Sequence, residues 1–212
     1  SDECYEQLTY DVPFKSIATF NPSLSNIITF QSCSKTYAMT GWRIGYLAGN
    51  ATLVKAISKL QGQSTSCPNS IAQYAAIEAY RGDHLEYLSS VKKILSLVGN
   101  YVYENLKSNV INIAKPQGGF YLFPEFTNAK FSSSSEMCKH ILKKTGVALL
   151  PGSDFGIDKS KMLARLSYTD FDGANFLKNT LGSKKLDNAD LKKNAPDIVS
   201  GVKVLKEWSN SL

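Results

Sequence analysis

The sequence predicts an α/β protein in two parts, a region of strands and helices followed by a smaller α+β region. Apolar, β-branched runs bounded by turn residues alternate with segments whose apolar residues recur every three or four positions. One periodic segment, 85–107, is long enough for roughly six helical turns, and a helix of this length often bridges two domains. The chain then changes to shorter, alternating pieces. We therefore expect one part over residues 1–92 and a second over 93–212.

The first part is expected to hold two strands and two complete helices. Residues 5–10 are typical of an irregular or strand-like piece. The run Asn26–Gln31 is rich in β-branched residues and predicts a buried strand. The other expected elements are a strand over 43–48, a helix over 51–61 with Asn50 as its N-cap and Gly62 at its end, and a helix over 70–81 that ends before Gly82.

The second part is expected to combine the long helix with short strands and three further helices. Apolar residues from Leu88 to Val102 recur at helical spacing along 85–107 and form one stripe. The expected strands are 110–114, 119–123, 147–150 and 162–167, and the expected helices are 136–144 with a serine cap, 172–181 and 189–209.

Composition excludes several classes of function. The net charge of +6 and the sequence pI of about 9.0 suit anionic small molecules or phosphate. The lysine doublets are dispersed rather than gathered in a patch, so we expect no nucleic-acid partner. No apolar run approaches the roughly 18–20 residues of a membrane span, so we expect no membrane partner.

Cysteine and histidine usage predicts a cytoplasmic protein without a metal site. The four cysteines are widely spaced, with neither a CxxC pair nor the rhythm of a disulfide framework, so we expect reduced thiols. With only His84 and His140 available, no zinc-binding spacing exists and a histidine-based catalytic triad is not expected. Both histidines are predicted to lie on the surface.

The stretch from Ser32 to Gly45 carries the strongest chemical signal. Lys35 comes just after the first predicted strand, and Arg43 comes eight positions later, where the second is expected to begin. Ligands of α/β sheets bind at such strand ends. Ser32, Ser34 and the fork-shaped guanidinium of Arg43 suit a phosphate, while the amine of Lys35 is a nucleophile for a carbonyl. This combination predicts a site for a phosphorylated aldehyde cofactor.

The same stretch, SCSKTYAMTGWRIG, resembles the cofactor-lysine signature of the class I/II, aspartate-aminotransferase-like (fold-type I) family of pyridoxal 5′-phosphate enzymes. Other pieces agree in order and spacing. Residues 1–5 resemble the family's Asp-x-x-Tyr segment, 116–121 its glycine-rich turn, 150–152 its entry to the substrate side and 164–168 its substrate-carboxylate strand. The resemblance implies that the chain is the C-terminal portion of the family's large domain plus its small α+β C-terminal domain.

The resemblance assigns cofactor chemistry to three residues. Lys35 would hold the pyridoxal phosphate covalently and then act as the acid and base that moves the substrate proton. Asp2 would pair with the pyridine nitrogen and keep it protonated, and Tyr5 would donate a hydrogen bond to the phenolic oxygen of the ring. The resemblance thereby implies an amino-group transfer between an amino acid and a 2-oxo acid.

Binding roles follow from the same resemblance. Ser32, Ser34 and Arg43 would bind the cofactor phosphate, and Arg165 would bind the substrate α-carboxylate. The substrate pair suggested is aspartate with 2-oxoglutarate, although no arginine occurs in 61–72, where some members carry one for a distal carboxylate. The intact enzyme is expected to be a homodimer.

Part of the family's cofactor site has no counterpart in this chain. The upstream phosphate loop, the asparagine on the ring oxygen and the stacking aromatic would all precede Asp2. The isolated chain is therefore expected to be a poor or inactive catalyst. Two alternatives remain open: a lyase, decarboxylase or synthase on the same scaffold, and a non-catalytic remnant that serves as a dimerisation module.

Overall fold

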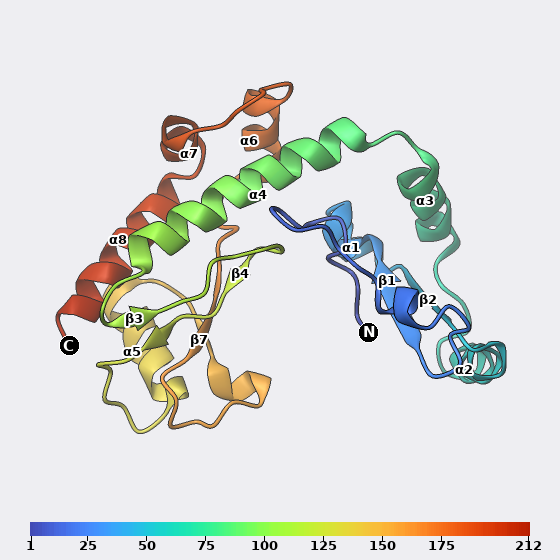
Figure 1. Ribbon diagram of the computed structural model, residues 1–212, viewed down its shortest axis with the longest axis horizontal. Coiled ribbons are helices and arrows are strands. Elements are labelled where there is room, and N and C mark those ends of the chain that lie inside the picture. The colour runs from blue at the N-terminus through green and yellow to red at the C-terminus, as the bar shows by residue number, and fades with distance from the viewer. The chain divides into compact units, whose positions relative to one another are not determined.

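A computed structural model describes every residue from Ser1 to Leu212 and shows a mixed α/β protein (Figure 1). The chain divides into two compact units, Ser1–Leu88 and Ser89–Leu212. The division falls within α4 (Leu85–Leu106), the long helix that the sequence predicts as a connector. None of the helices combines the length and apolar character needed to cross a membrane.

The first unit is built around an antiparallel strand pair. β1 (Ile28–Ser32) pairs with β2 (Gly45–Gly49), in a register that runs from Ile28 opposite Gly49 to Ser32 opposite Gly45. Both strands are predicted, but each begins two residues later than expected. The prediction that β1 is buried is wrong in this unit, because only Thr29 is buried and Phe30 is 46% exposed.

Residues 1–3 lie parallel to β1 on its other edge. Phe30 N donates to the Ser1 carbonyl oxygen at 2.8 Å, and Glu3 N donates to the Phe30 carbonyl oxygen at 2.9 Å. This bridge places Asp2 beside Phe30. The buried carboxylate of Glu3 accepts from Ser16 Oγ and from Ile17 N, both at 3.0 Å, and so fixes the segment to the 3₁₀-helix η1 (Ile17–Phe20).

The helices of the first unit confirm most of the predicted capping signals. The side chain of Asn50 accepts from Thr52 N and caps α2, and α3 ends before Gly82 as predicted. The prediction that Gly62 ends α2 is wrong, because the helix continues to Ser64 and accommodates the glycine in its interior at a propensity cost of about 1 kcal/mol. The helices are α1 (Cys33–Thr36), the 3₁₀-helix η2 (Thr40–Trp42), α2 (Ala51–Ser64) and α3 (Ser70–Arg81).

The second unit packs short strands and helices around one core. A three-stranded antiparallel sheet has the order β4-β7-β6, and β3 pairs separately with β5. The predicted stripe of α4 is buried in this core from Ile94 to Val102. The elements are β3 (Ile111–Asn112), β4 (Tyr121–Leu122), β5 (Glu125–Phe126), α5 (Ser134–Thr145), β6 (Leu150–Pro151), the 3₁₀-helix η3 (Gly152–Phe155), β7 (Ala164–Ser167) and α6 (Gly173–Thr180).

The C-terminal region differs from the prediction of one helix over 189–209. Two helices are present, α7 (Asn188–Asn194) and α8 (Pro196–Asn210). Ala195 lies between them with an extended φ of −137°. Pro196 explains the break, because its ring excludes a helical residue before it and suits the first position of a new helix.

The expectation that both histidines lie on the surface is also wrong. His84 is half-buried with its ring centroid 5.9 Å from that of Tyr37. His140 is half-buried among the rings of Phe131 and Trp208, and its Nδ1 accepts from Trp208 Nε1 at 3.2 Å. His140 therefore holds α5 against α8, which is a packing role.

Candidate active site

Lys35 lies on α1, the single helical turn that follows β1. Ser32 is both the last residue of β1 and the N-cap of α1, because its Oγ accepts from Ser34 N at 3.0 Å. Cys33 and Thr36 are buried and anchor the turn, whereas Lys35 is half-buried. The turn thus holds the amine at the end of the strand, as the sequence predicts.

The hydroxyls of Ser32 and Ser34 form a pair beside this turn. Their Oγ atoms lie 2.7 Å apart, and Ser32 Oγ is also within donating distance, 3.2 Å, of the Ile44 carbonyl oxygen. These contacts join the end of β1 to the residue that precedes β2. They place two hydroxyl groups on the side where a phosphate is expected.

Arg43 does not begin a strand as predicted but ends η2. Its backbone is in the left-handed region, with φ 51° and ψ 49°, a conformation that no strand residue adopts. Its Nη1 donates to the Thr40 carbonyl oxygen at 3.0 Å, and the residue is exposed. It borders an open hollow of about 940 Å³ that neither Ser32 nor Lys35 lines. Arg43 therefore offers its remaining donors to solvent.

The antiparallel register explains why these residues share one end of the strand pair. Ser32 lies opposite Gly45, so the chain that carries Lys35 and Arg43 leaves and returns at the same end. Only glycine fits at position 45, since a Cβ there would lie 2.7 Å from the Gln31 carbonyl oxygen. The register thus brings the backbone at Ser32 and Arg43 to the same end of the strand pair, while the joint binding of a phosphate by their side chains stays a prediction.

Asp2 and Lys35 both act electrostatically on Cys4. Asp2 Oδ1 accepts from Cys4 N at 3.2 Å. Burial, followed by a hydrogen bond to the Asp2 side chain, raises the pKa of the Cys4 thiol to about 11, while the charge of Lys35 acts in the opposite direction. The carboxylate and the amine are thus brought to one neighbourhood. Sequence analysis did not single out Cys4, although it lies inside the Asp-x-x-Tyr segment.

Tyr5 occupies the turn that follows Asp2. It is half-buried, and its carbonyl oxygen accepts from the N–H of the buried Leu8 at 2.8 Å. Residues 4–7 form a turn rather than the strand-like piece that was one of the two expectations. The bridge of Asp2 to β1 and the turn at Tyr5 together fix this segment beside the strand that leads to Lys35.

A layer of aromatic rings packs against Cys33 and Tyr37, on and after α1. The ring of Tyr80 lies edge-on to those of Tyr37 and Tyr46, with both centroid distances 5.5 Å. Burial raises the pKa of all three phenols, and a hydrogen bond with Cys33 raises that of Tyr80 further. This neutral layer supports the turn that carries Lys35.

Arg165 lies on β7, the central strand of the second unit's sheet. Its neighbours in the strand, Ala164 and Leu166, are buried, so alternation along the strand directs Arg165 away from the core. The guanidinium carbon lies 4.4 Å from the ring centroid of Tyr121 and 4.7 Å from that of Phe155. Arg165 forms no ion pair with a carboxylate of the chain. An unpaired, half-buried guanidinium is suited to an anionic group.

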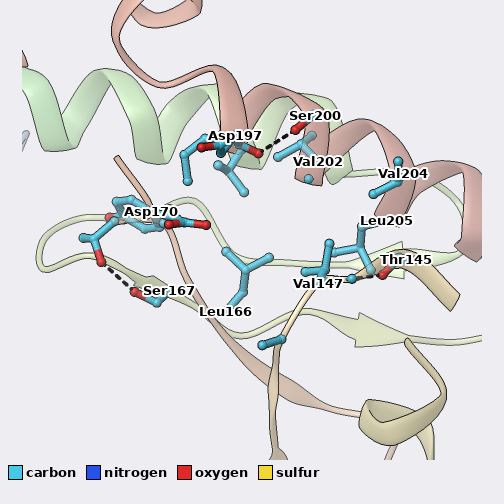
Figure 2. Close-up of a pocket in the computed structure, with 17 residues that line it drawn as sticks. Thr145, Val147, Leu166, Ser167, Asp170, Asp197, Ser200, Val202, Val204 and Leu205 are labelled. Carbon is cyan, nitrogen blue, oxygen red and sulfur yellow. Dashed lines mark hydrogen bonds between the residues drawn. The ribbon is translucent and has the colours of Figure 1, made fainter. Parts of the chain in front are cut away.

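A hollow in the second unit has different chemistry (Figure 2). Its volume is about 630 Å³, and it is reached by Leu166, which points to the opposite side of β7 from Arg165. Asp170 and Asp197 are the only charged residues that line it. A pocket with carboxylates and no cation does not suit a substrate carboxylate, so it is separate from the site of Arg165.

Comparisons with known proteins show which proteins this chain is similar to. A family model described as aminotransferase class I and II matches residues 1–181. The aspartate aminotransferase of Geobacillus stearothermophilus is 40% identical over 178 residues, which cover 79% of this chain and 44% of that protein. A probable N-acetyl-LL-diaminopimelate aminotransferase of Bacillus subtilis is 40% identical over 158 residues, which cover 73% of this chain and 38% of that protein.

A solved structure extends the similarity to nearly the whole chain. The crystal structure of an aspartate aminotransferase from Thermotoga maritima matches with a TM-score of 0.74 and 29% identity, over 99% of this chain and 47% of that one. The chain thus spans less than half the length of the relatives it matches.

Proposed function

Since the chain belongs to the class I and II aminotransferase family, we propose that it supplies the catalytic lysine and the substrate-carboxylate site of an enzyme that transfers an amino group between an L-amino acid and a 2-oxo acid. The observation that carries this proposal is the position of Lys35, at one strand end with Ser32, Ser34 and Arg43 and in one electrostatic neighbourhood with Asp2. Family membership implies pyridoxal 5′-phosphate as the cofactor.

The residues present suit this cofactor by the chemistry of their donors. The amine of Lys35 suits an aldehyde, two hydroxyls and a guanidinium suit a phosphate, and a carboxylate suits a protonated ring nitrogen. When bound, the cofactor supplies an electron sink for the negative charge that develops at the substrate α-carbon. Tyr5 is the proposed hydrogen-bond donor to the ring oxygen.

In the proposed mechanism Lys35 has two tasks. Its Nζ would hold the cofactor at the aldehyde carbon, with water as the leaving group, and as a free amine it would take the proton from the substrate α-carbon. Asp2 stabilises positive charge on the ring nitrogen, which favours loss of that α-proton. Arg165 would bind the α-carboxylate and so orient the substrate. The α-proton would then face Lys35 in every substrate, whatever its side chain.

The proposed substrate pair is aspartate with 2-oxoglutarate. The name of the aspartate aminotransferase of Geobacillus stearothermophilus, at 40% identity, supports the aspartate half of this pair. A probable N-acetyl-LL-diaminopimelate aminotransferase of Bacillus subtilis has the same identity. N-acetyl-LL-diaminopimelate is therefore the first alternative substrate to assay.

The proposed working form is a cytoplasmic homodimer. All four cysteines are free, which supports a reducing compartment. Several large apolar side chains of α2 and α3 are strongly exposed, including Leu60 at 71% and Tyr74 at 75%. Apolar surface of this kind supports a further protein contact, which we propose to be a second subunit or the upstream half of the enzyme.

Site-specific attachment of the cofactor tests the proposal. The chain, reconstituted with its separately expressed upstream half, would be mixed with pyridoxal phosphate at low molar ratio, reduced with borohydride and mapped by peptide mass spectrometry. We expect modification at Lys35 well above that at Lys59, an exposed lysine of α2 that serves as the internal reference. Equal labelling of the two lysines would refute the assignment.

Activity tests the expectation that the upstream half is needed. Transamination by the isolated chain should be weak, because Arg43 and two serines form only part of a phosphate site. Addition of a separately expressed upstream half should restore it. Full activity of the chain alone would contradict this expectation.

A further inference from the structure

Glu3 carries a buried carboxyl group that the proposed mechanism does not use. It is only 4% exposed, although its neighbour Asp2 is exposed. Its Oε1 accepts two hydrogen bonds of 3.0 Å, one from Ser16 Oγ and one from Ile17 N. A carboxyl group is costly to bury unless its hydrogen bonds are made, so the buried position of Glu3 depends on these two donors.

Both donors lie at the start of η1. Ser16 is the N-cap of this 3₁₀-helix, and Ile17 is its first residue, whose N–H has no acceptor within the helix. Glu3 therefore supplies an acceptor that the start of η1 needs. The helix itself packs beside β1, the strand that leads to Lys35.

The backbone of Glu3 joins the segments that carry the two proposed ring contacts, Asp2 and Tyr5. Its N–H donates to the Phe30 carbonyl oxygen at 2.9 Å and forms part of the bridge that places Asp2 beside β1. Its carbonyl oxygen accepts from Glu6 N at 3.0 Å, across the turn that contains Tyr5. Glu3 is therefore bonded to β1, to this turn and to η1.

The attachments of Asp2 itself are local or depend on its neighbours. The hydrogen bonds of the bridge join Phe30 to Ser1 and to Glu3, on either side of Asp2. The Asp2 carboxylate accepts from Cys4 N, two residues along the chain, and this contact ties it to no other element. Short segments with few buried contacts open readily, so the bonds of the Glu3 side chain to η1 are the anchor of this segment.

We propose that Glu3 is a positioning residue for Asp2, which holds residues 1–3 against β1 and so keeps the Asp2 carboxylate in the neighbourhood of Lys35. This inference rests on the proposed function, which gives Asp2 its role at the ring nitrogen of the cofactor. It goes further, because Glu3 contacts neither cofactor nor substrate in that proposal. A carboxylate stabilises a charge best from a fixed position, so a mobile Asp2 would stabilise the ring nitrogen less.

The reactivity of Cys4 reports on the position of Asp2 without any cofactor. The Asp2 side chain raises the pKa of the Cys4 thiol, so a displaced carboxylate should leave a more reactive thiol. Alkylation by iodoacetamide would be followed at pH 8, with the exposed Cys67 as the internal reference. We expect Glu3→Leu to accelerate the modification of Cys4 about tenfold, which corresponds to one pKa unit. Glu3→Gln should react like the wild type, because an amide oxygen can accept both hydrogen bonds.

Two milder variants each remove one donor and leave Glu3 in place. Ser16→Ala deletes the hydroxyl. Ile17→Pro deletes the N–H where the preceding residue, with φ −61° and ψ 140°, already has the backbone conformation that proline requires. Each should accelerate Cys4 alkylation about threefold, the effect of one modest hydrogen bond. Thr19→Ala is the matched control and should change nothing, because this hydroxyl of η1 donates to the Ser16 carbonyl oxygen instead.

Replacement of Asp2 separates its positioning from simple cover of Cys4. If Glu3 acts through Asp2, the acceleration by Glu3→Leu should be much smaller in an Asp2→Asn background. Equal acceleration in both backgrounds would show that Glu3 only shields Cys4 from solvent, and the proposal would be wrong. Unchanged rates in Glu3→Leu, Ser16→Ala and Ile17→Pro would also overturn it.

The affinity of the enzyme reconstituted with its upstream half for pyridoxal phosphate tests the link to the proposed function. Glu3→Leu should weaken binding about tenfold, as Asp2→Asn does, and the double variant should bind no more weakly than Asp2→Asn. Further weakening in the double variant would show that Glu3 acts on another group and would refute the inference. Wild-type affinity in Asp2→Asn would instead refute the role of Asp2 at the ring nitrogen, while the alkylation rates still decide whether Glu3 positions Asp2.

Discussion

Gly99 of α4 lies directly against the phenol ring of Tyr168, so that a Cβ at position 99 would be 2.8 Å from Tyr168 Oη. The same hydroxyl donates to the Gly119 carbonyl oxygen at 3.1 Å, and Tyr168 is fully buried. Gly99→Ala should therefore destabilise the second unit by about 1–3 kcal/mol, despite the better helix propensity of alanine. Denaturant unfolding followed by the fluorescence of Trp208 would measure this change.

Gly62→Ala is the matched control for that prediction. Gly62 lies inside α2, where no atom is within 4 Å of an added Cβ. Alanine should therefore stabilise the helix by about 0.5–1 kcal/mol. Similar effects of the two substitutions would contradict the close packing of Gly99 against Tyr168.

The thiol of Cys4 reports on the charges around it. Its pKa is raised to about 11, first by burial and then by Asp2, so alkylation by iodoacetamide should be slow at pH 8 and should accelerate with each pH unit up to about 11. Asp2→Asn should lower the pKa and speed the reaction at fixed pH, whereas Lys35→Met should slow it. Cys67 is exposed and serves as the internal reference.

The raised pKa of Cys4 also makes the free energy of unfolding depend on pH. Because the folded-state pKa of Cys4 lies above the ordinary value of 9.0, the unfolded chain loses the proton first as pH rises. The contribution of Cys4 to stability is thus full below about pH 9 and is lost as pH rises toward 11. Unaltered alkylation rates in Asp2→Asn and Lys35→Met would contradict the proximity of these three residues.

Arg43 combines a proposed phosphate-binding group with a strained backbone. Its left-handed conformation costs a non-glycine residue about 1–2 kcal/mol, so Arg43→Gly should leave stability within about 1 kcal/mol of the wild type. Arg43→Val should destabilise the first unit by about 1–2 kcal/mol, because a β-branched residue resists this conformation. Thermal unfolding followed by Trp42 fluorescence would distinguish the two variants.

The affinity for pyridoxal phosphate distinguishes the loss of the Arg43 guanidinium from the change in backbone strain. Both variants should bind pyridoxal phosphate about tenfold or more weakly, since each loses a charge-assisted hydrogen bond. Retention of wild-type affinity by Arg43→Gly would show that the guanidinium does not contact the phosphate.

Arg165→Ala should weaken the binding of every amino-acid substrate, whatever its side chain. The enzyme reconstituted with its upstream half would be titrated with amino acids and with the corresponding amines, which lack the carboxylate. Loss of a charge-assisted hydrogen bond predicts about 10- to 100-fold weaker binding of the amino acids. An equal loss for the amines would show that Arg165 acts on something other than the carboxylate.

Local chemistry made the capping and strand-end features predictable. Asn50 and Gly82 each act at the helix end where the sequence places them, because capping depends on a few neighbouring residues. The grouping of Lys35 with Ser32 also follows from local order, since one residue caps the turn that carries the other. The match to the family was predicted from the same stretch.

The break at Ala195 was missed because the prediction followed periodicity and gave no weight to Pro196, which is a local signal.

Features that depend on distant contacts could not be predicted from local sequence. Arg165 and the two rings beside it, Tyr121 and Phe155, come from three separate segments of chain, which the pairing of β4 and β6 with β7 brings together. The anchoring of Asp2 likewise depends on β1, more than twenty residues away.

The pairing of Ser32 with Gly45 has a consequence for protein engineering. The loop over residues 33–44 begins and ends at this one strand pair. The segment that carries Lys35, Ser34 and Arg43 could therefore be transferred to another protein as one piece. The recipient protein would need an antiparallel strand pair with a glycine at the position that corresponds to Gly45. It would also need space in its core for the side chains of Cys33 and Thr36. A longer or shorter loop between Lys35 and Arg43 would then change the distance between the amine and the guanidinium, while the strand register of the recipient protein stayed the same.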